Sequence, residues 1–254
     1  LERLRGGKKL FYGADNILAS AAYSLEDGYL LGKALAVTKP HDDIAEAACS
    51  VLGPQAVGKL VDVFLDAGSK LRDRTRTYDK VASDRYSALD QRLAHTQGGT
   101  LVAAVLARSD TAKDKELADL CELFARRNDT EDGRGRPFDV EARVSIGNLA
   151  KKWAKRLLNS EGISRHDKAA IASMISHAPS VDLLPTLRQL LDDNLVSYHN
   201  FREAAKASRW RDDASVQEAQ NPHMHEYQSA LISIRAPETF DLAVGYLTNE
   251  HFGE

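Results

Sequence analysis

Residues 27–35, DGYLLGKAL, place a glycine and a Gly-Lys pair at a spacing close to that of a phosphate-binding loop. Such a loop needs four residues between the first glycine and the pair, so that consecutive N–H groups surround a phosphate. Only three residues separate Gly28 from Gly32, and Ala34 follows Lys33 where a magnesium-binding hydroxyl is required. The preceding residues also have helical rather than strand periodicity. We therefore expect a turn at Asp27-Gly28, then a helix, and no nucleotide site in this chain.

Two histidines, His223 and His225, come nearest to a metal-binding motif. Asn221 and Pro222 predict that a helix starts here, with the asparagine as N-cap and the proline in the first position. Residues two apart on a helix point about 200° away from each other, so the two imidazoles cannot share one metal ion. His223 with Glu226 has a suitable spacing, but a pair without further ligands is a weak zinc signature. We expect no bound metal.

Two basic stretches are candidates for binding. KKWAKR at 151–156 places four cations in the last turns of a predicted helix, where they complement the negative end of the helix dipole. Contact with nucleic-acid phosphates is the alternative reading of that stretch. FREAAKASRWRDD at 201–213 is the better candidate for an interaction surface, because arginine and tryptophan are enriched at binding hot spots. Its alternative is a tryptophan buried between helices beside a solvated basic face. The candidate interaction residues are Arg202, Lys206, Arg209, Trp210 and Arg211.

No combination of residues predicts a catalytic centre. The sequence shows no Ser/His/Asp set, no helix with paired inward carboxylates and no glycine-rich cradle. Cys121 lies among leucines and a phenylalanine at helical spacing, which indicates a buried core thiol rather than a nucleophile. We therefore expect neither enzymatic activity nor a cofactor in this segment.

The elements that position these residues are predicted to be helices. Apolar residues recur with a helical period over nearly all of the chain, and few stretches alternate as strands do. Turn residues separate these stretches regularly, so roughly ten to twelve helices are expected. The clearest apolar stripes are Ala142, Ile146, Leu149, Ala150, Trp153 and Leu157; Tyr78, Ala82, Tyr86, Leu89 and Leu93; Ile171, Met174, Ile175 and Ala178; and Met224, Tyr227, Leu231 and Ile234.

Three breaks between helices share one design, in which a proline occupies the first position of the next helix. The prolines are Pro54, Pro179 and Pro237. After Pro54 and Pro237 the apolar residues fall at the same offsets of 3, 6, 7 and 10. The two stripes are Val57, Leu60, Val61 and Phe64, and Phe240, Ala243, Val244 and Leu247.

Helix pairs of this kind form HEAT and armadillo solenoids, in which each pair buries its stripe against its neighbours. The later two prolines are 58 residues apart (237 − 179), which is longer than a regular HEAT unit of about 40–47 residues. The excess predicts an inserted helix and loop near 195–220. The fold class is therefore all-α, an irregular α-solenoid of HEAT/armadillo-like antiparallel helix pairs.

The composition restricts the function further. The longest apolar run, LVAAVLA at 101–107, is far shorter than the roughly 20 residues of a membrane span. With 34 basic and 37 acidic residues, the net charge of −3 gives no general attraction to nucleic acid. Two cysteines exclude a disulfide framework and suit the cytoplasm. The chain begins at Leu1 and stops at NEHFGE, and we expect it to be a piece of a longer protein.

From residue 116 to 252 the pattern becomes more specific, with LLDDNL, YQSALISI and the terminal YLTNEHFG as its most distinctive stretches. This region resembles the helical repeats that lie C-terminal to the ATPase of large bacterial NACHT-type (STAND) signal-transducing NTPases. The resemblance covers a little over half of the chain, and it carries over no catalytic residue. It implies a sensor module of an antiviral defence switch, with ATP handled upstream. Residues 1–115 match only in helical character, so we predict N-terminal helical repeats at 1–115 and HEAT-like repeats at 116–254.

The expected function is that of a non-catalytic interaction solenoid. Its expected partners are a protein or other macromolecular trigger and other domains of the same longer chain, without a membrane. The alternative is a stand-alone HEAT-like scaffold, or a nucleic-acid-binding protein related to the helical-repeat DNA glycosylases. The nucleic-acid reading requires a continuous cationic groove with aromatic side chains, for which Trp153 and Trp210 are available.

Overall fold

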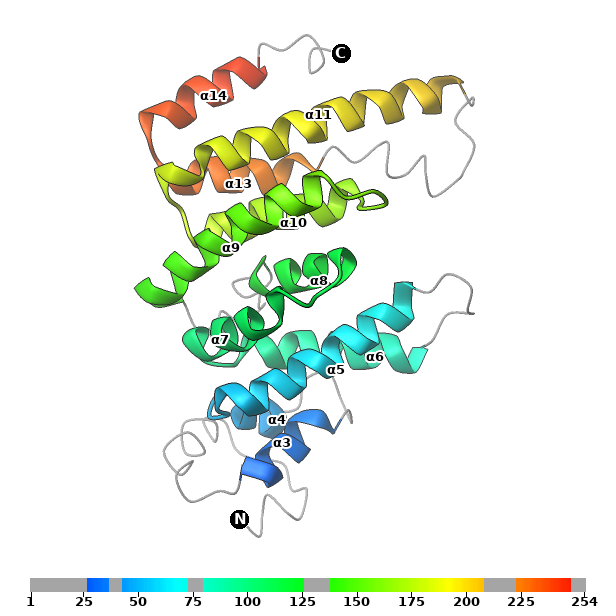
Figure 1. The fold of residues 1–254 in the computed structure, drawn as a ribbon, viewed down its shortest axis with the longest axis vertical. Helices are drawn as coiled ribbons and strands as arrows, with labels where there is room; N and C mark the ends of the chain where they lie inside the picture. Colours follow the sequence, from blue (N-terminus) through cyan, green and yellow to red (C-terminus); the bar gives the residue numbers. More distant parts are fainter. Residues whose placement is uncertain (1–26, 37–42, 73–79, 126–137, 208–222, 248–254) are drawn as a thin grey trace. The chain divides into compact units, whose positions relative to one another are not determined.

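A computed structural model of the protein describes residues 27–36, 43–72, 80–125, 138–207 and 223–247 (Figure 1). These residues form eleven α-helices and one short 3-10 turn, and they contain no strand. The all-α prediction is confirmed. The helices are α3 (Asp27–Leu35), α4 (Asp43–Cys49), α5 (Pro54–Arg72), α6 (Lys80–Ala94), α7 (Gly98–Ser109), α8 (Asp114–Ala125), α9 (Val140–Leu158), α10 (Arg165–His177), α11 (Leu184–Ala207), α13 (Met224–Ile234) and α14 (Pro237–Leu247), with the 3-10 turn η3 at Val181–Leu183.

The chain divides into two compact units, and the division passes through α8. The first unit comprises Leu1–Asp119 and Arg126–Ala142, and the second comprises Leu120–Ala125 and Arg143–Glu254. The boundary predicted after residue 115 lies in the first turn of that same helix.

In the first unit, α5 packs against α6 and α7, and α3 packs against α4 (Figure 1). Pro54 begins α5 as predicted, because its fixed φ suits the first helical position and its missing N–H is not needed there. The ring of Phe64 stacks on that of Tyr86 from α6, with the ring centroids 4.5 Å apart. The stripe predicted after Pro54 is fully buried: Val57, Leu60, Val61 and Phe64.

A buried arginine connects α6 to the end of α3. Arg92 has no exposed surface, and its Nη1 donates a hydrogen bond of 2.7 Å to the backbone carbonyl of Ala34. Ala34 lies in the last turn of α3, where carbonyl groups lack partners within the helix. Burial raises the pKa of the Cys49 thiol to about 12, although the Arg92 charge opposes this rise while Glu46 adds to it. The arginine is therefore a cationic cap that holds α6 against the end of α3.

An ion pair joins α5 to α7. The guanidinium of Arg108 donates from Nη2 to Asp62 Oδ2 at 2.7 Å and from Nε to Asp62 Oδ1. Gly58 lies one turn before Asp62, and a Cβ atom there would come within 2.8 Å of Arg108 Nη2. The glycine leaves the space that the guanidinium occupies.

In the second unit, α10 packs most extensively against α13 and also contacts α11, while α13 contacts α14 (Figure 1). Trp153 on α9 is fully buried and lies against Phe124 from α8, with ring centroids 6.3 Å apart. The predicted stripes on α9 and α10 are confirmed, because every residue of both is buried. Thus α10, rather than a pair of consecutive helices, is at the centre of the packing in this unit.

Two predictions about helices in the second unit are wrong. Pro179 does not begin a helix, because the turn η3 precedes α11, which starts at Leu184. The part of the predicted insertion near 195–220 that the structure describes belongs to α11, which extends without a break to Ala207, and residues 208–222 lie outside the described residues. Pro237 begins α14 as predicted, but the stripe after it is not buried. Phe240 is 71% exposed and Val244 is 40% exposed, because no described helix covers that side.

Replacing Arg92 with methionine tests the buried cap. The change keeps most of the apolar stem but removes the hydrogen bond to the Ala34 carbonyl, which then has no cationic partner. Loss of a buried hydrogen bond to a charged group lowers the free energy of unfolding by about 1.5–3 kcal/mol. Urea denaturation of the variant should show a loss of that size. Arg188→Met, at a residue that is 69% exposed, should change it by less than about 0.5 kcal/mol; equal losses in both variants would contradict the capping role.

Candidate functional site

The second unit contains a cluster of two histidines and two glutamates. His166 Nε2 lies 3.4 Å from Glu122 Oε1, and His223 Nδ1 lies 3.9 Å from Glu226 Oε1. The two imidazole rings are tilted by 46° to each other, with their centroids 5.4 Å apart. These four residues, which we call the histidine–glutamate cluster, come from α8, α10 and the start of α13.

The start of α10 positions one half of the cluster. Ser164 is the N-cap of this helix, and its side chain accepts a 3.1 Å hydrogen bond from the backbone N–H of Asp167. The Asp167 carboxylate accepts one from the Ser164 N–H, which completes a capping box. This cap fixes the first turn of α10, which carries Arg165 and His166. Arg165 is buried, and its guanidinium carbon lies 5.3 Å from the centroid of the Tyr198 ring on α11.

The start of α13 positions the other half and differs from the prediction. The helix begins at Met224, so His223 is its N-cap and not a residue within the helix. His223 has φ 50° and ψ 29°, a left-handed conformation that is uncommon for residues other than glycine. Only 7% of its side chain is exposed. This backbone conformation directs the imidazole toward Glu226 and His166 instead of into solvent; Asn221 and Pro222, the predicted cap and first residue, lie outside the described residues.

The charges of the cluster affect its acidic and phenolic groups. Burial acts to raise the pKa of Glu226, but the nearby His223 and His166 and the backbone of Glu226 favour the charged carboxylate and lower this pKa below its ordinary value. Burial raises the pKa of Tyr227, and the negative charges of Asp193 and Glu226 add to that rise. The Tyr227 hydroxyl is fully buried, and it has no hydrogen-bond partner among the described residues. Glu226 therefore stays ionised and Tyr227 stays neutral over the ordinary pH range.

A nearby ion pair ties α10 to α11. Lys168 Nζ lies 2.9 Å from Asp193 Oδ2, and only 12% of the lysine side chain is exposed. The described part of the chain brings no three His, Cys, Asp or Glu side chains into an arrangement that would hold a metal ion. The contacts of the histidine–glutamate cluster join α8, α10 and the start of α13.

The structure separates the candidate residues suggested by the sequence. Gly28 to Lys33 lie within the continuous helix α3, so they do not form a phosphate-binding loop. Arg202 and Lys206 lie on α11, while Arg209, Trp210 and Arg211 lie outside the described residues. The four cations of 151–156 are all exposed on α9, whereas Trp153 between them is buried and cannot stack on a base.

Most of the histidine–glutamate cluster could not be recognised from the sequence. The spacing of His223 and Glu226 gave a signal, because residues three apart share a helix face. His166 and Glu122 gave none, since they approach this pair only through the packing of α8, α10 and α13.

Comparisons with protein-family models, with curated proteins and with solved structures find no match. The resemblance to NACHT-type NTPases therefore stays a prediction. Among the described helices, none is both long and apolar enough to cross a membrane.

Replacing Glu226 with glutamine tests the electrostatics of the cluster. Because folding lowers the pKa of this carboxyl, its ionisation stabilises the folded state above the unfolded pKa of about 4.3. That stabilisation is lost as the pH falls through the lowered, folded-state pKa. Glu226→Gln should therefore be less stable than the original protein at pH 7, and the difference should shrink toward pH 3.

Urea denaturation at a series of pH values measures this difference. Glu238→Gln is a matched control, because Glu238 is an exposed acid in the first turn of α14. A difference for Glu226→Gln that stays constant from pH 7 to pH 3 would show that the charge of Glu226 has no role in stability.

Proposed function

We propose that this chain is a non-catalytic interaction module, the sensor solenoid of a larger bacterial NACHT-type NTPase in a cytoplasmic defence or signalling switch. The observation that supports this best is the way helices cover one another. The stripes of α5, α9 and α10 are fully buried, and Pro54 and Pro237 begin new helices directly after short turns. Units of this kind stack into extended arrays that bind along their length. The resemblance of residues 116–252 to the helical repeats of NACHT-type NTPases is the reason for proposing that the larger protein belongs to this class.

Such a module acts through contact. A solenoid flexes slightly at each repeat, so a trigger can select one curvature or docking state. The trigger can control a distant ATPase only when it binds one state more tightly than the other, because equal affinity shifts nothing. In this proposal the histidine–glutamate cluster and the buried arginines keep neighbouring helices in register, and an exposed surface makes the contact.

The proposed contact surface is the basic stretch that includes Arg202, Lys206, Arg209, Trp210 and Arg211. Its first two residues lie on the last turns of α11, a single helix of 24 residues. A long helix is a rigid support, which limits the entropy lost when a partner binds. Arginine with tryptophan supplies both charge and a large apolar surface.

The test uses the full-length protein with Arg209 and Arg211 replaced by glutamate. Reversing two charges at the proposed surface should weaken trigger binding about tenfold or more, and stimulation of the ATPase should be lost with it. Binding is measured by calorimetry, and ATPase activity by phosphate release. Lys80→Glu with Arg85→Glu, on exposed positions of α6, is the matched control and should leave both unchanged.

Two results would overturn different parts of the proposal. If trigger binding and ATPase stimulation persist in the correctly folded Arg209/Arg211 variant, the contact surface lies elsewhere. If deletion of residues 116–254 leaves triggering unchanged, this segment is not the sensor.

A further inference from the structure

Helix α14 buries little of its surface against the rest of the second unit. Among the side chains that the structure describes on α14, only Tyr246 is buried, at 9% exposure. Phe240 and Val244 are exposed, and Val244 lies about 200° around the helix from Tyr246. On the preceding helix α13, Tyr227 and Ala230 have no exposed surface (Figure 1). The burial that keeps α14 in place is therefore concentrated on one side chain.

This buried side chain forms a hydrogen bond with α11. The Tyr246 hydroxyl donates to Asp192 Oδ1 at 2.6 Å, a length typical of a hydroxyl that donates to a carboxylate. Arg188 Nε lies 3.9 Å from the other carboxylate oxygen of Asp192. Burial raises the pKa of Tyr246, and the hydrogen bond and charge of Asp192 add to that rise, while Arg188 opposes it. Tyr246 therefore keeps its proton at neutral pH, and the hydrogen bond to Asp192 persists.

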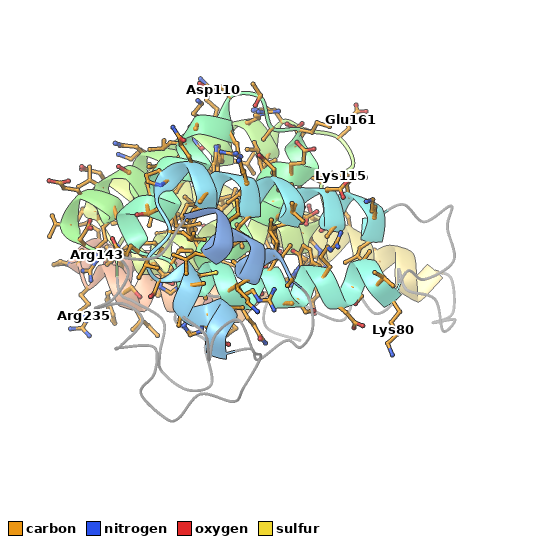
Figure 2. All side chains as sticks on the ribbon, turned by 90° about the horizontal axis from the view of Figure 1, so that it is seen from below. Lys80, Asp110, Lys115, Arg143, Glu161 and Arg235 are labelled. Carbon is orange, nitrogen blue, oxygen red and sulfur yellow. The ribbon has the colours of Figure 1, made fainter. Side chains whose placement is uncertain are left out.

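The connection from α13 to α14 contains a residue in an unfavourable conformation. Arg235 follows α13 with φ 52° and ψ 39°, in the left-handed region, where the Cβ of an L-residue comes too close to the following carbonyl oxygen. His223 is also in this region, but its side chain is buried beside Glu226. Arg235 is exposed and projects away from the helices (Figure 2), so packing of its side chain does not compensate the strain. The connection between the two helices imposes it.

The strain lies at one residue between two hydrogen-bonded segments. Helix α13 ends at Ile234. The carbonyl of Ala236 accepts hydrogen bonds from the N–H of Thr239, at 3.0 Å, and from its hydroxyl. Ala236 is thereby fixed to the first turn of α14, and Pro237 after it disfavours a helical conformation that would continue α13. Rotation at Arg235 alone can therefore move α14 relative to α13, and leaving the left-handed region releases the strain.

We propose that α14 detaches from α11 and α13 while the other helices of the second unit stay folded, with Arg235 as the hinge and the Tyr246–Asp192 hydrogen bond opposing detachment. Helix α14 has 11 residues and includes Gly245. Isolated helices shorter than about 12–15 residues are marginal in water, and glycine weakens a helix further, so α14 unfolds once it is released. Its release uncovers the sides of α11 and α13 against which it lies. This proposal does not depend on the proposed function.

Amide hydrogen exchange, followed by mass spectrometry on the 254-residue chain, measures this opening. The amides of α14 should exchange at least about tenfold faster than those of α10, since releasing one helix costs less than unfolding the unit. Tyr246→Phe removes the hydrogen bond and should speed exchange in α14 by about tenfold to a hundredfold. Asp192→Ala should act similarly, and the double variant should exchange no faster than either single variant, because both changes remove one interaction. Exchange in α10 should stay unchanged in all three variants.

Arg235→Gly tests the hinge. Glycine adopts the left-handed region without steric cost, so this variant should slow exchange in α14 by about threefold. Gln228→Gly, at an exposed position within α13, is the matched control and should instead speed exchange in α13, because glycine is unfavourable inside a helix. Asp241→Asn removes an exposed charge from α14 away from the Tyr246–Asp192 hydrogen bond and should leave exchange unchanged.

Several outcomes would overturn the proposal. Equal exchange rates in α14 and α10 of the original chain, or equal acceleration of both by Tyr246→Phe, would show that α14 does not open separately. Additive effects of Tyr246→Phe and Asp192→Ala would show that their hydrogen bond does not hold the helix. Faster exchange in α14 of Arg235→Gly would show that Arg235 stores no strain. Circular dichroism checks that every variant remains helical.

Discussion

Most of the described helices have one side that is too apolar to remain in water, so they are stable only where another helix covers that side. Burying a leucine, valine or phenylalanine side chain contributes about 1.5–3 kcal/mol, whereas intrinsic helix propensities differ by less than about 1 kcal/mol per residue. The fully buried stripe of α5 and the burial of Trp153 on α9 satisfy this constraint. The side of α14 that carries Phe240 and Val244 does not satisfy it within the part of the chain that the structure describes.

Polar groups buried at helix ends determine which helices meet. Arg92 binds a carbonyl at the end of α3, and His223 and Arg165 lie at the starts of α13 and α10. An apolar stripe tolerates small shifts along a neighbouring helix, because any apolar neighbour covers it. A buried charge does not tolerate them, since moving it away from its partner leaves it desolvated. These residues therefore select one packing among several that would bury similar apolar areas.

Local features of this fold could be predicted from the sequence, and features that depend on packing could not. Pro54 and the stripe from Ala142 to Leu157 were predicted correctly, because helix starts and periodicity are properties of neighbouring residues. The stripe after Pro237 has the same periodicity as that after Pro54, yet whether it is covered depends on helices far away in the chain. Likewise, Glu122 joins His166 only because α8 and α10 belong to one packed unit. The prediction that Pro179 begins a helix is wrong, because a 3-10 turn separates this proline from α11.

Each unit contains one buried cysteine, and the reactivity of that cysteine reports how often the helices around it separate. Cys49 lies in the first unit and Cys121 in the second, and neither has exposed surface. Only a thiolate reacts readily with alkylating reagents, so burial protects both thiols by limiting access, and the pKa of Cys49, raised to about 12, protects that thiol further. Its modification requires the surrounding helices to separate first. The rate at which each thiol is alkylated under native conditions therefore measures how often its own unit opens, and compares the local stabilities of the two units without any added label.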